Sequence, residues 1–103
     1  MPSIHFVERN DSIRRRETDR THWESGDWVI TPQRAQTLVG GNVYFHRGQK
    51  ERSHFGGAIT GFRVIAAPHP NAGRLIFEFT FDDACRDVPS PSSGWGNEQN
   101  YQP

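Results

Sequence analysis

The chain has 103 residues, which suffice for one domain with one core and exclude a second. Twelve Lys and Arg balance twelve Asp and Glu, and this zero formal charge excludes the overall basic surface of a dedicated duplex binder. No apolar run approaches the roughly 20 residues that span a bilayer, so we expect no membrane contact. The N-terminus lacks the apolar stretch of a secretory signal, and the one cysteine has no disulfide partner within the chain. We therefore expect a cytoplasmic protein.

Residues 1–22 predict a weakly ordered N-terminal segment. Residues 4–7 have the pattern of a short strand, but residues 8–20 alternate charges with almost no apolar side chain to bury. The arginine triplet at 14–16 would suit a nucleic-acid arm. Acidic neighbours surround the triplet, however, and a solvated segment is the favoured interpretation.

Residues 23–88 carry the patterns of a β-rich domain, starting with a turn at 25–27 and a strand at 28–30. Thr31 followed by Pro32 predicts the start of a short helix, because the hydroxyl caps the first turn and proline needs no donor there. Gly40 and Gly41 predict its end, because glycine readily adopts the left-handed conformation of a C-terminal cap.

Three further runs predict strands, at residues 42–45, 58–66 and 74–81. Gly61 inside the second run predicts a bulge or a close approach by another group. We therefore expect an α+β, mainly β domain: a small mixed, mostly antiparallel curled sheet or barrel with one short helix. Residues 89–103 begin with a run of Pro and Ser and predict a C-terminal tail.

Two short motifs in this domain resemble those of a known superfamily. The run Gly26-Asp27-Trp28-Val29-Ile30 and, after a helix, the run Gly57-Ala58-Ile59-Thr60-Gly61-Phe62-Arg63-Val64 resemble the PUA-like superfamily of small barrels, in particular the EVE and ASCH domains. This resemblance implies recognition of RNA or of a modified base in DNA by an aromatic pocket at one end of a barrel. The chain also resembles small uncharacterised bacterial proteins with a similar Trp-Glu-Ser-Gly start and Gly-Trp-Gly-x-Glu end, which implies no function.

If the PUA-like resemblance holds, aromatic side chains would stack on a base, short polar side chains would read its edge, and cations from the basic loop at 46–54 would contact phosphates. Trp23 is the preferred ligand contact, whereas packing in the core is the favoured alternative for Trp28 and Phe55. The candidate binding residues are Trp23, Trp28, Tyr44 and Phe55 for stacking, Ser25, Asp27 and Ser53 for the base edge, Arg47, Lys50 and Arg52 for phosphates, and His54 in the same loop.

Two other functions stay open. A metal-independent ribonuclease would use His46 and His54 as acid and base, with Lys50 as the cation that stabilises the transition state. Histidines in a polar loop more often have no catalytic role, so a protein without catalysis is favoured. A protein-interaction or accessory module would dock Trp95 and Tyr101 on a partner or on a second copy in a homodimer.

No spacing of His, Cys, Asp or Glu predicts a metal site, and we expect no cofactor.

Overall fold

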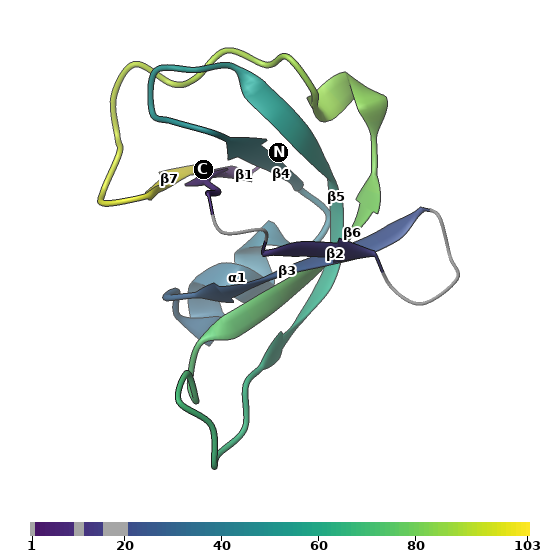
Figure 1. Ribbon diagram of the computed structural model, residues 1–103, viewed down its shortest axis with the longest axis vertical. Coiled ribbons are helices and arrows are strands. Elements are labelled where there is room, and N and C mark those ends of the chain that lie inside the picture. The colour runs from purple at the N-terminus through teal and green to yellow at the C-terminus, as the bar shows by residue number, and fades with distance from the viewer. Residues whose placement is uncertain (1, 10–11, 16–20) are drawn as a thin grey trace.

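Alternating apolar residues build one mixed, mostly antiparallel sheet in the computed structural model, which describes residues 2–9, 12–15 and 21–103 (Figure 1). Within these residues the strand order is β2-β3-β6-β5-β4-β1-β7, and of the neighbouring pairs only β1 and β4 run parallel. The strands are β1 (Ser3–Val7), β2 (Ile13–Arg15), β3 (His22–Trp28), β4 (Asn42–His46), β5 (Ser53–Val64), β6 (Leu75–Phe81) and β7 (Gln99–Gln102).

The predicted fold class is confirmed, because the domain is mainly β with one curled sheet and one short helix. The barrel alternative is wrong. Strands β2 and β7 stand at the two ends of the sheet order and do not pair with each other, so the sheet curls without closing.

Helix α1 (Pro32–Leu38) begins and ends at the predicted signals. The hydroxyl of Thr31 accepts a hydrogen bond from the backbone N–H of Arg34 at 3.2 Å, and Gly40 after the helix has a φ of +90°. Ala35 and Leu38 are fully buried against the sheet. The helix therefore fills part of the hollow that the curled sheet leaves open.

The hydrophobic core includes residues from the N-terminal segment. Ile4 and Phe6 of β1 are buried beside Phe45, and β1 pairs with β4 on one side and β7 on the other. The short strand predicted at residues 4–7 is present as β1, and residues 99–102 of the expected C-terminal tail form β7. Arg14 and Arg15 of the arginine triplet are exposed on β2, whereas the third position, 16, lies outside the described residues.

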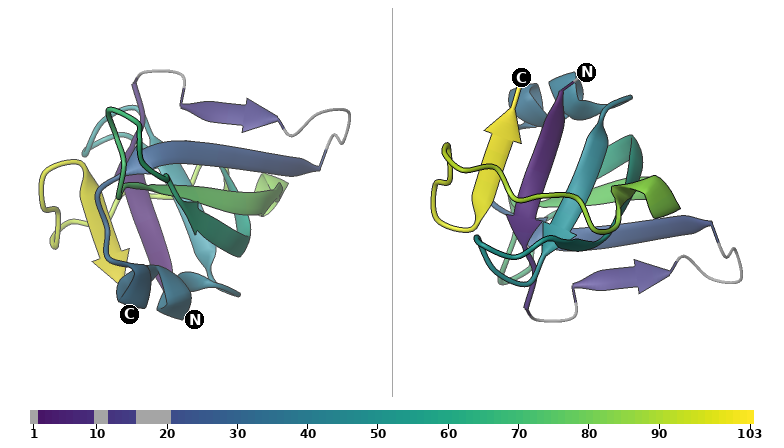
Figure 2. Two further views of the ribbon diagram at one scale, coloured as in Figure 1. Left: turned by 90° about the horizontal axis from the view of Figure 1, so that it is seen from below. Right: turned by 90° about the horizontal axis from the view of Figure 1, so that it is seen from above.

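A second layer covers the outer face of β1 and β4. Figure 2 shows the chain after β6 crossing over β4 and β1 before it returns as β7. Several hydrogen bonds hold this crossing segment. In two of them, Ser53 donates to the carbonyl of Cys85 at 2.7 Å, and Asn100 donates to that of Ser93 at 2.9 Å. The outer face of the sheet is consequently shielded, and His5 beneath it is 5% exposed.

Strand β3 does not contain the predicted turn. It runs through Ser25 to Trp28, and its register with β6 shifts between these two residues as at a β-bulge. Neighbouring residues of a regular strand point to opposite faces, whereas both Asp27 and Trp28 line the cleft described below. The bulge predicted at Gly61 is confirmed by a register shift between Ile59 and Gly61.

Candidate functional site

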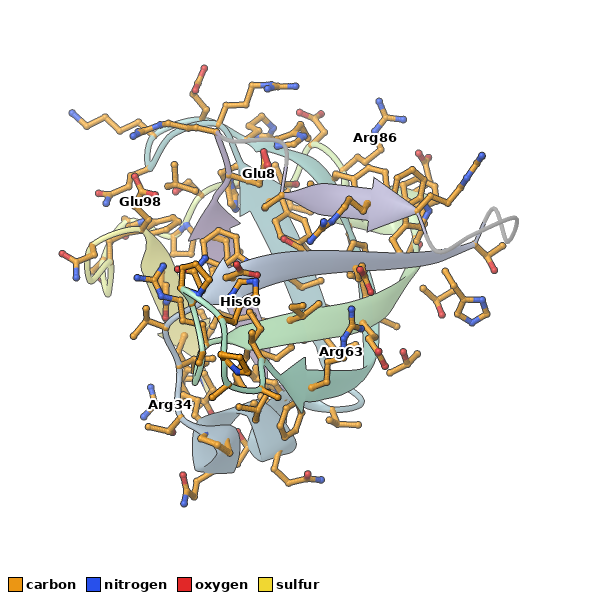
Figure 3. All side chains as sticks on the ribbon, turned by 60° about the horizontal axis from the view of Figure 1, so that its bottom comes forward. Glu8, Arg34, Arg63, His69, Arg86 and Glu98 are labelled. Carbon is orange, nitrogen blue, oxygen red and sulfur yellow. The ribbon has the colours of Figure 1, made fainter. Side chains whose placement is uncertain are left out.

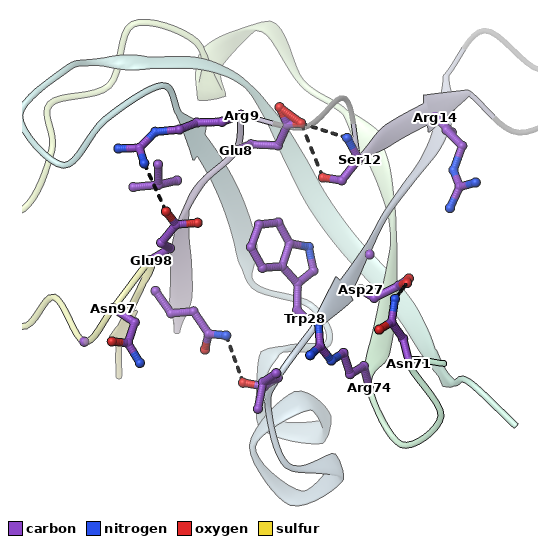
Figure 4. A pocket seen from close by; sticks show the side chains of 15 residues that line it. Glu8, Arg9, Ser12, Arg14, Asp27, Trp28, Asn71, Arg74, Asn97 and Glu98 are labelled. Atoms are coloured by element: carbon purple, nitrogen blue, oxygen red, sulfur yellow. Dashed lines mark hydrogen bonds and ion pairs between the residues drawn. The ribbon is translucent and has the colours of Figure 1, made fainter. Parts of the chain in front are cut away.

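A polar cleft of about 650 Å³ lies where the end of β1, the start of β2 and the bulge of β3 meet (Figure 4). The turn before β6 and the turn before β7 complete its walls. Glu8 and Glu98 both line this cleft, whereas Arg34 lies away from Glu8 on helix α1 (Figure 3). The lining of the cleft therefore comes from segments that are far apart in the sequence.

Trp28 forms an immobilised aromatic wall of the cleft. Its indole stacks on Phe6 with ring centroids 3.9 Å apart and an angle of 14° between the planes. The indole N–H donates to the hydroxyl of Ser25 at 3.1 Å, and that hydroxyl lies 3.0 Å from the hydroxyl of Ser12. Because Ser25 is fully buried, it orients Trp28 and does not contact solvent.

Two carboxylates present acceptor oxygens to the cleft. The Oε2 atom of Glu8, a residue only 5% exposed, accepts from the backbone N–H of Ser12 at 2.8 Å and from its hydroxyl at 3.3 Å. The Oδ2 atom of Asp27 accepts from the side-chain amide of Asn71 at 2.7 Å. Among the described residues, Glu8 Oε1 and Asp27 Oδ1 have no hydrogen-bond donor, so one oxygen of each carboxylate remains available to a ligand.

Three arginines lie on the rim of the cleft. Arg9 forms an ion pair with Glu98 at 3.1 Å and donates to the backbone carbonyl of Arg47 at 3.3 Å. In the part of the chain that the structure describes, the guanidinium groups of Arg14 and Arg74 form no ion pair. These two cations are therefore available to an anionic ligand.

Three of the predicted stacking residues lie outside the cleft. Trp23 is half-buried against the edge of Phe55, with ring centroids 4.9 Å apart. Tyr44 stacks on His5 on the outer face of the sheet, at 4.7 Å. For Trp28 the sequence left two alternatives, a ligand contact and packing in the core. Its indole packs against the core and also lines the cleft.

Two predicted edge readers have structural contacts instead. Ser25 orients Trp28, and Ser53 donates to the Cys85 carbonyl while it accepts from the backbone N–H of Val88 at 2.8 Å. Ser53 is 5% exposed. Of the proposed edge readers, Asp27 is the one that lines the cleft.

The basic loop between β4 and β5 does not reach the cleft with its cationic side chains. Lys50 and Arg52 line a separate shallow hollow together with Trp95. Arg52 is paired with Asp87 at 2.8 Å, and Arg47 is exposed. The three predicted phosphate contacts are thus absent from the lining of the cleft that contains Trp28.

The two histidines of the ribonuclease alternative, His46 and His54, form no hydrogen bond with each other. His46 is fully buried, and its Nδ1–H donates to the carbonyl of Glu51 at 2.8 Å. Its Nε2 atom accordingly accepts from His5 Nδ1 at 2.8 Å. Burial, aided by His46, lowers the pKa of His5 to about 4, and burial also lowers the pKa of His46.

His54 has a different environment. Burial lowers its pKa, and its Nε2 atom is buried without a hydrogen-bond partner among the described residues. Because His46 is enclosed and engaged at both ring nitrogens, it cannot contact a phosphate as the side chains stand. The arrangement needed for the ribonuclease alternative is therefore absent from the described structure.

The two aromatic residues expected to dock on a partner make contacts within the chain. Trp95 packs edge-on against His5 and His46, with its indole N–H donating to the carbonyl of Pro91 at 3.1 Å. The guanidinium carbon of Arg34 lies 4.1 Å from the ring centroid of Tyr101.

Several cleft residues were not predicted from the sequence. Glu8, Ser12 and Arg14 belong to the charged segment for which the sequence favours solvation, and Asn71 and Arg74 belong to a turn cluster. The one local signal was the neighbouring pair Asp27 and Trp28. The others required knowledge of which strands lie side by side.

No protein-family model, curated protein or solved structure matches this chain. No helix in the described part of the chain is long and apolar enough to cross a membrane. The described residues also contain no group of three or more His, Cys, Asp and Glu placed to bind a metal ion. The site is therefore interpreted from its own geometry and chemistry.

Proposed function

We propose that this domain binds single-stranded nucleic acid, RNA or a modified base in DNA, with one nucleobase held in the cleft against Trp28. The observation that carries the proposal is the fixed indole, which Phe6 supports from one face and Ser25 orients through its N–H. A base stacked on an aromatic side chain gains about 1–3 kcal/mol. A ring that is already immobilised loses little further freedom on binding.

The rim cations support the same proposal. Arg14 and Arg74 line the cleft and have no ion-pair partner among the described residues, so their charge is available to phosphates on either side of a bound base. With zero formal charge on the chain, these contacts are local, and the affinity should depend modestly on salt. For single strands the logarithm of affinity falls by about 0.7 per phosphate contact for each tenfold rise in salt.

The direct test measures binding of short, labelled single-stranded RNA and DNA by fluorescence anisotropy at low and physiological salt. Trp28→Ala should weaken binding about 5- to 150-fold, because a base that loses its stacking partner loses about 1–3 kcal/mol. The matched control is Trp23→Ala, which removes an indole that lies outside the cleft and should leave the affinity unchanged.

A second measurement uses the unaltered protein, because Trp28→Ala also removes a packing partner of Phe6. In NMR titrations the indole N–H signal of Trp28 should shift on addition of oligonucleotide, whereas that of Trp23 should not. No binding of any oligonucleotide at low salt, or equal shifts of both indoles, would contradict the proposal.

A further inference from the structure

The acceptor groups of the cleft restrict which base it can take. Glu8 Oε1 and Asp27 Oδ1 are the carboxylate oxygens left without a donor in the described residues, and both residues line the cleft beside Trp28. Glu8 cannot turn away easily, because its other oxygen is bonded to both the backbone and the hydroxyl of Ser12 in a buried position. The cleft that Trp28 lines therefore also offers two acceptor oxygens to a base that occupies it.

The bases of RNA and DNA differ in the groups that they offer to such acceptors. Adenine, cytosine and guanine carry an exocyclic amino group whose two N–H bonds project from the ring toward a neighbouring acceptor. In uracil and thymine the one ring N–H lies between two carbonyl oxygens, which a carboxylate repels. Hydrogen bonds from a donor to an ionised acceptor are about twice as strong as those between neutral groups.

We infer that the base bound against Trp28 is an amino-bearing one, adenine, cytosine or guanine, and that Glu8, supported by Asp27, is the specificity-determining residue. This inference rests on the proposed nucleic-acid binding. The buried position of Glu8 supports this inference. A bound ligand would exclude the remaining water from this carboxylate, so the ligand must itself supply a hydrogen-bond donor.

The test compares unlabelled oligo(dA), oligo(dC) and oligo(dT) of equal length as competitors for a labelled mixed-sequence strand, with the full chain. We expect oligo(dA) or oligo(dC) to compete at least about tenfold better than oligo(dT), the discrimination typical of a well-placed contact to a base edge. In Glu8→Gln this preference should shrink to about threefold or less, because the amide also offers a donor to the thymine carbonyls.

A matched control separates base reading from a general effect of lost charge. Asp83→Asn removes one negative charge from an exposed carboxylate outside the cleft, so this variant should retain the preference. If oligonucleotides bind but oligo(dT) competes equally well or better, the inference on base class is overturned while the proposed function stands. If no oligonucleotide binds at all, the proposed function itself fails, and the inference with it.

Discussion

Gly57→Ala should destabilise the domain by more than about 3 kcal/mol, a large share of the roughly 5–15 kcal/mol that stabilises a typical domain. A Cβ atom built on Gly57 would lie 1.9 Å from the carbonyl oxygen of Thr80 on the neighbouring strand β6. A flexible side chain could rotate away, but this oxygen belongs to the backbone of the central β5–β6 pair. Accommodation therefore requires the two strands to move apart, which exposes core residues such as Phe79.

The matched control for this substitution is Gly96→Ala. A Cβ atom added at Gly96 would have no heavy atom within 4 Å beyond its chain neighbours, and Gly96 does not adopt a positive φ, so its variant should stay within about 0.5 kcal/mol of the parent protein. Urea unfolding followed by circular dichroism measures both variants. Similar unfolding midpoints for the two alanine variants would show that β5 and β6 are not packed as closely as the structure has them.

Features controlled by neighbours in the sequence could be predicted. The helix start at Thr31 depends on one hydroxyl and a proline, and both lie within a single turn of the helix. The apolar face of β6 depends on apolar residues at every second position within seven residues, and its Leu75, Phe77 and Phe79 are fully buried. In both cases the physical cause lies within a few residues.

Features that depend on distant partners could not be predicted. Strand β1 has only five residues, and its inclusion in the core depends on parallel pairing with β4, which begins at Asn42. The final strand β7 carries polar residues and is held by the opposite edge of β1, so its sequence shows no apolar run. The charged residues between β1 and β2 suggested solvation, yet Glu8 is buried by these long-range pairings.

In the candidate site, too, local patterns could be predicted and contacts between distant segments could not. Asp27 and Trp28 became candidates because they stand together in the short run that resembles a superfamily motif, which is a local pattern. Trp23, the preferred contact from the sequence, packs on Phe55, whereas Trp28 reaches the cleft through a bulge that its own sequence does not reveal. Exposure of an aromatic residue is decided by register, and a shift of one position reverses the face that it occupies.

The free energy of unfolding should fall by about 2 kcal/mol between pH 7 and pH 5, because of the buried histidine pair. In the folded protein His5 binds a proton only near pH 4, whereas its ordinary pKa in the unfolded chain is 6.5. Between these values the unfolded state binds more protons, so lowering the pH favours unfolding. The pKa of His46 is lowered in the same direction and adds to the loss.

The structural origin of this effect is the hydrogen bond between the two rings. Since His46 donates to the Glu51 carbonyl, its Nε2 atom must accept from His5, and protonation of His46 would set two donors against each other. The pair is enclosed by Tyr44 and Trp95, which exclude the water that would solvate an added charge.

The measurement is chemical unfolding of the parent protein and of His5→Gln at several values between pH 7 and pH 5. The glutamine amide supplies a donor for His46 but does not titrate, so the variant should lose the share of the pH dependence that His5 contributes. His46 and His54, whose pKa values burial also lowers, should retain theirs. His69→Gln, on the exposed turn before β6, should keep the full pH dependence. An unfolding free energy for the parent that stays constant across this range would mean that the histidine pair is not buried in its neutral form.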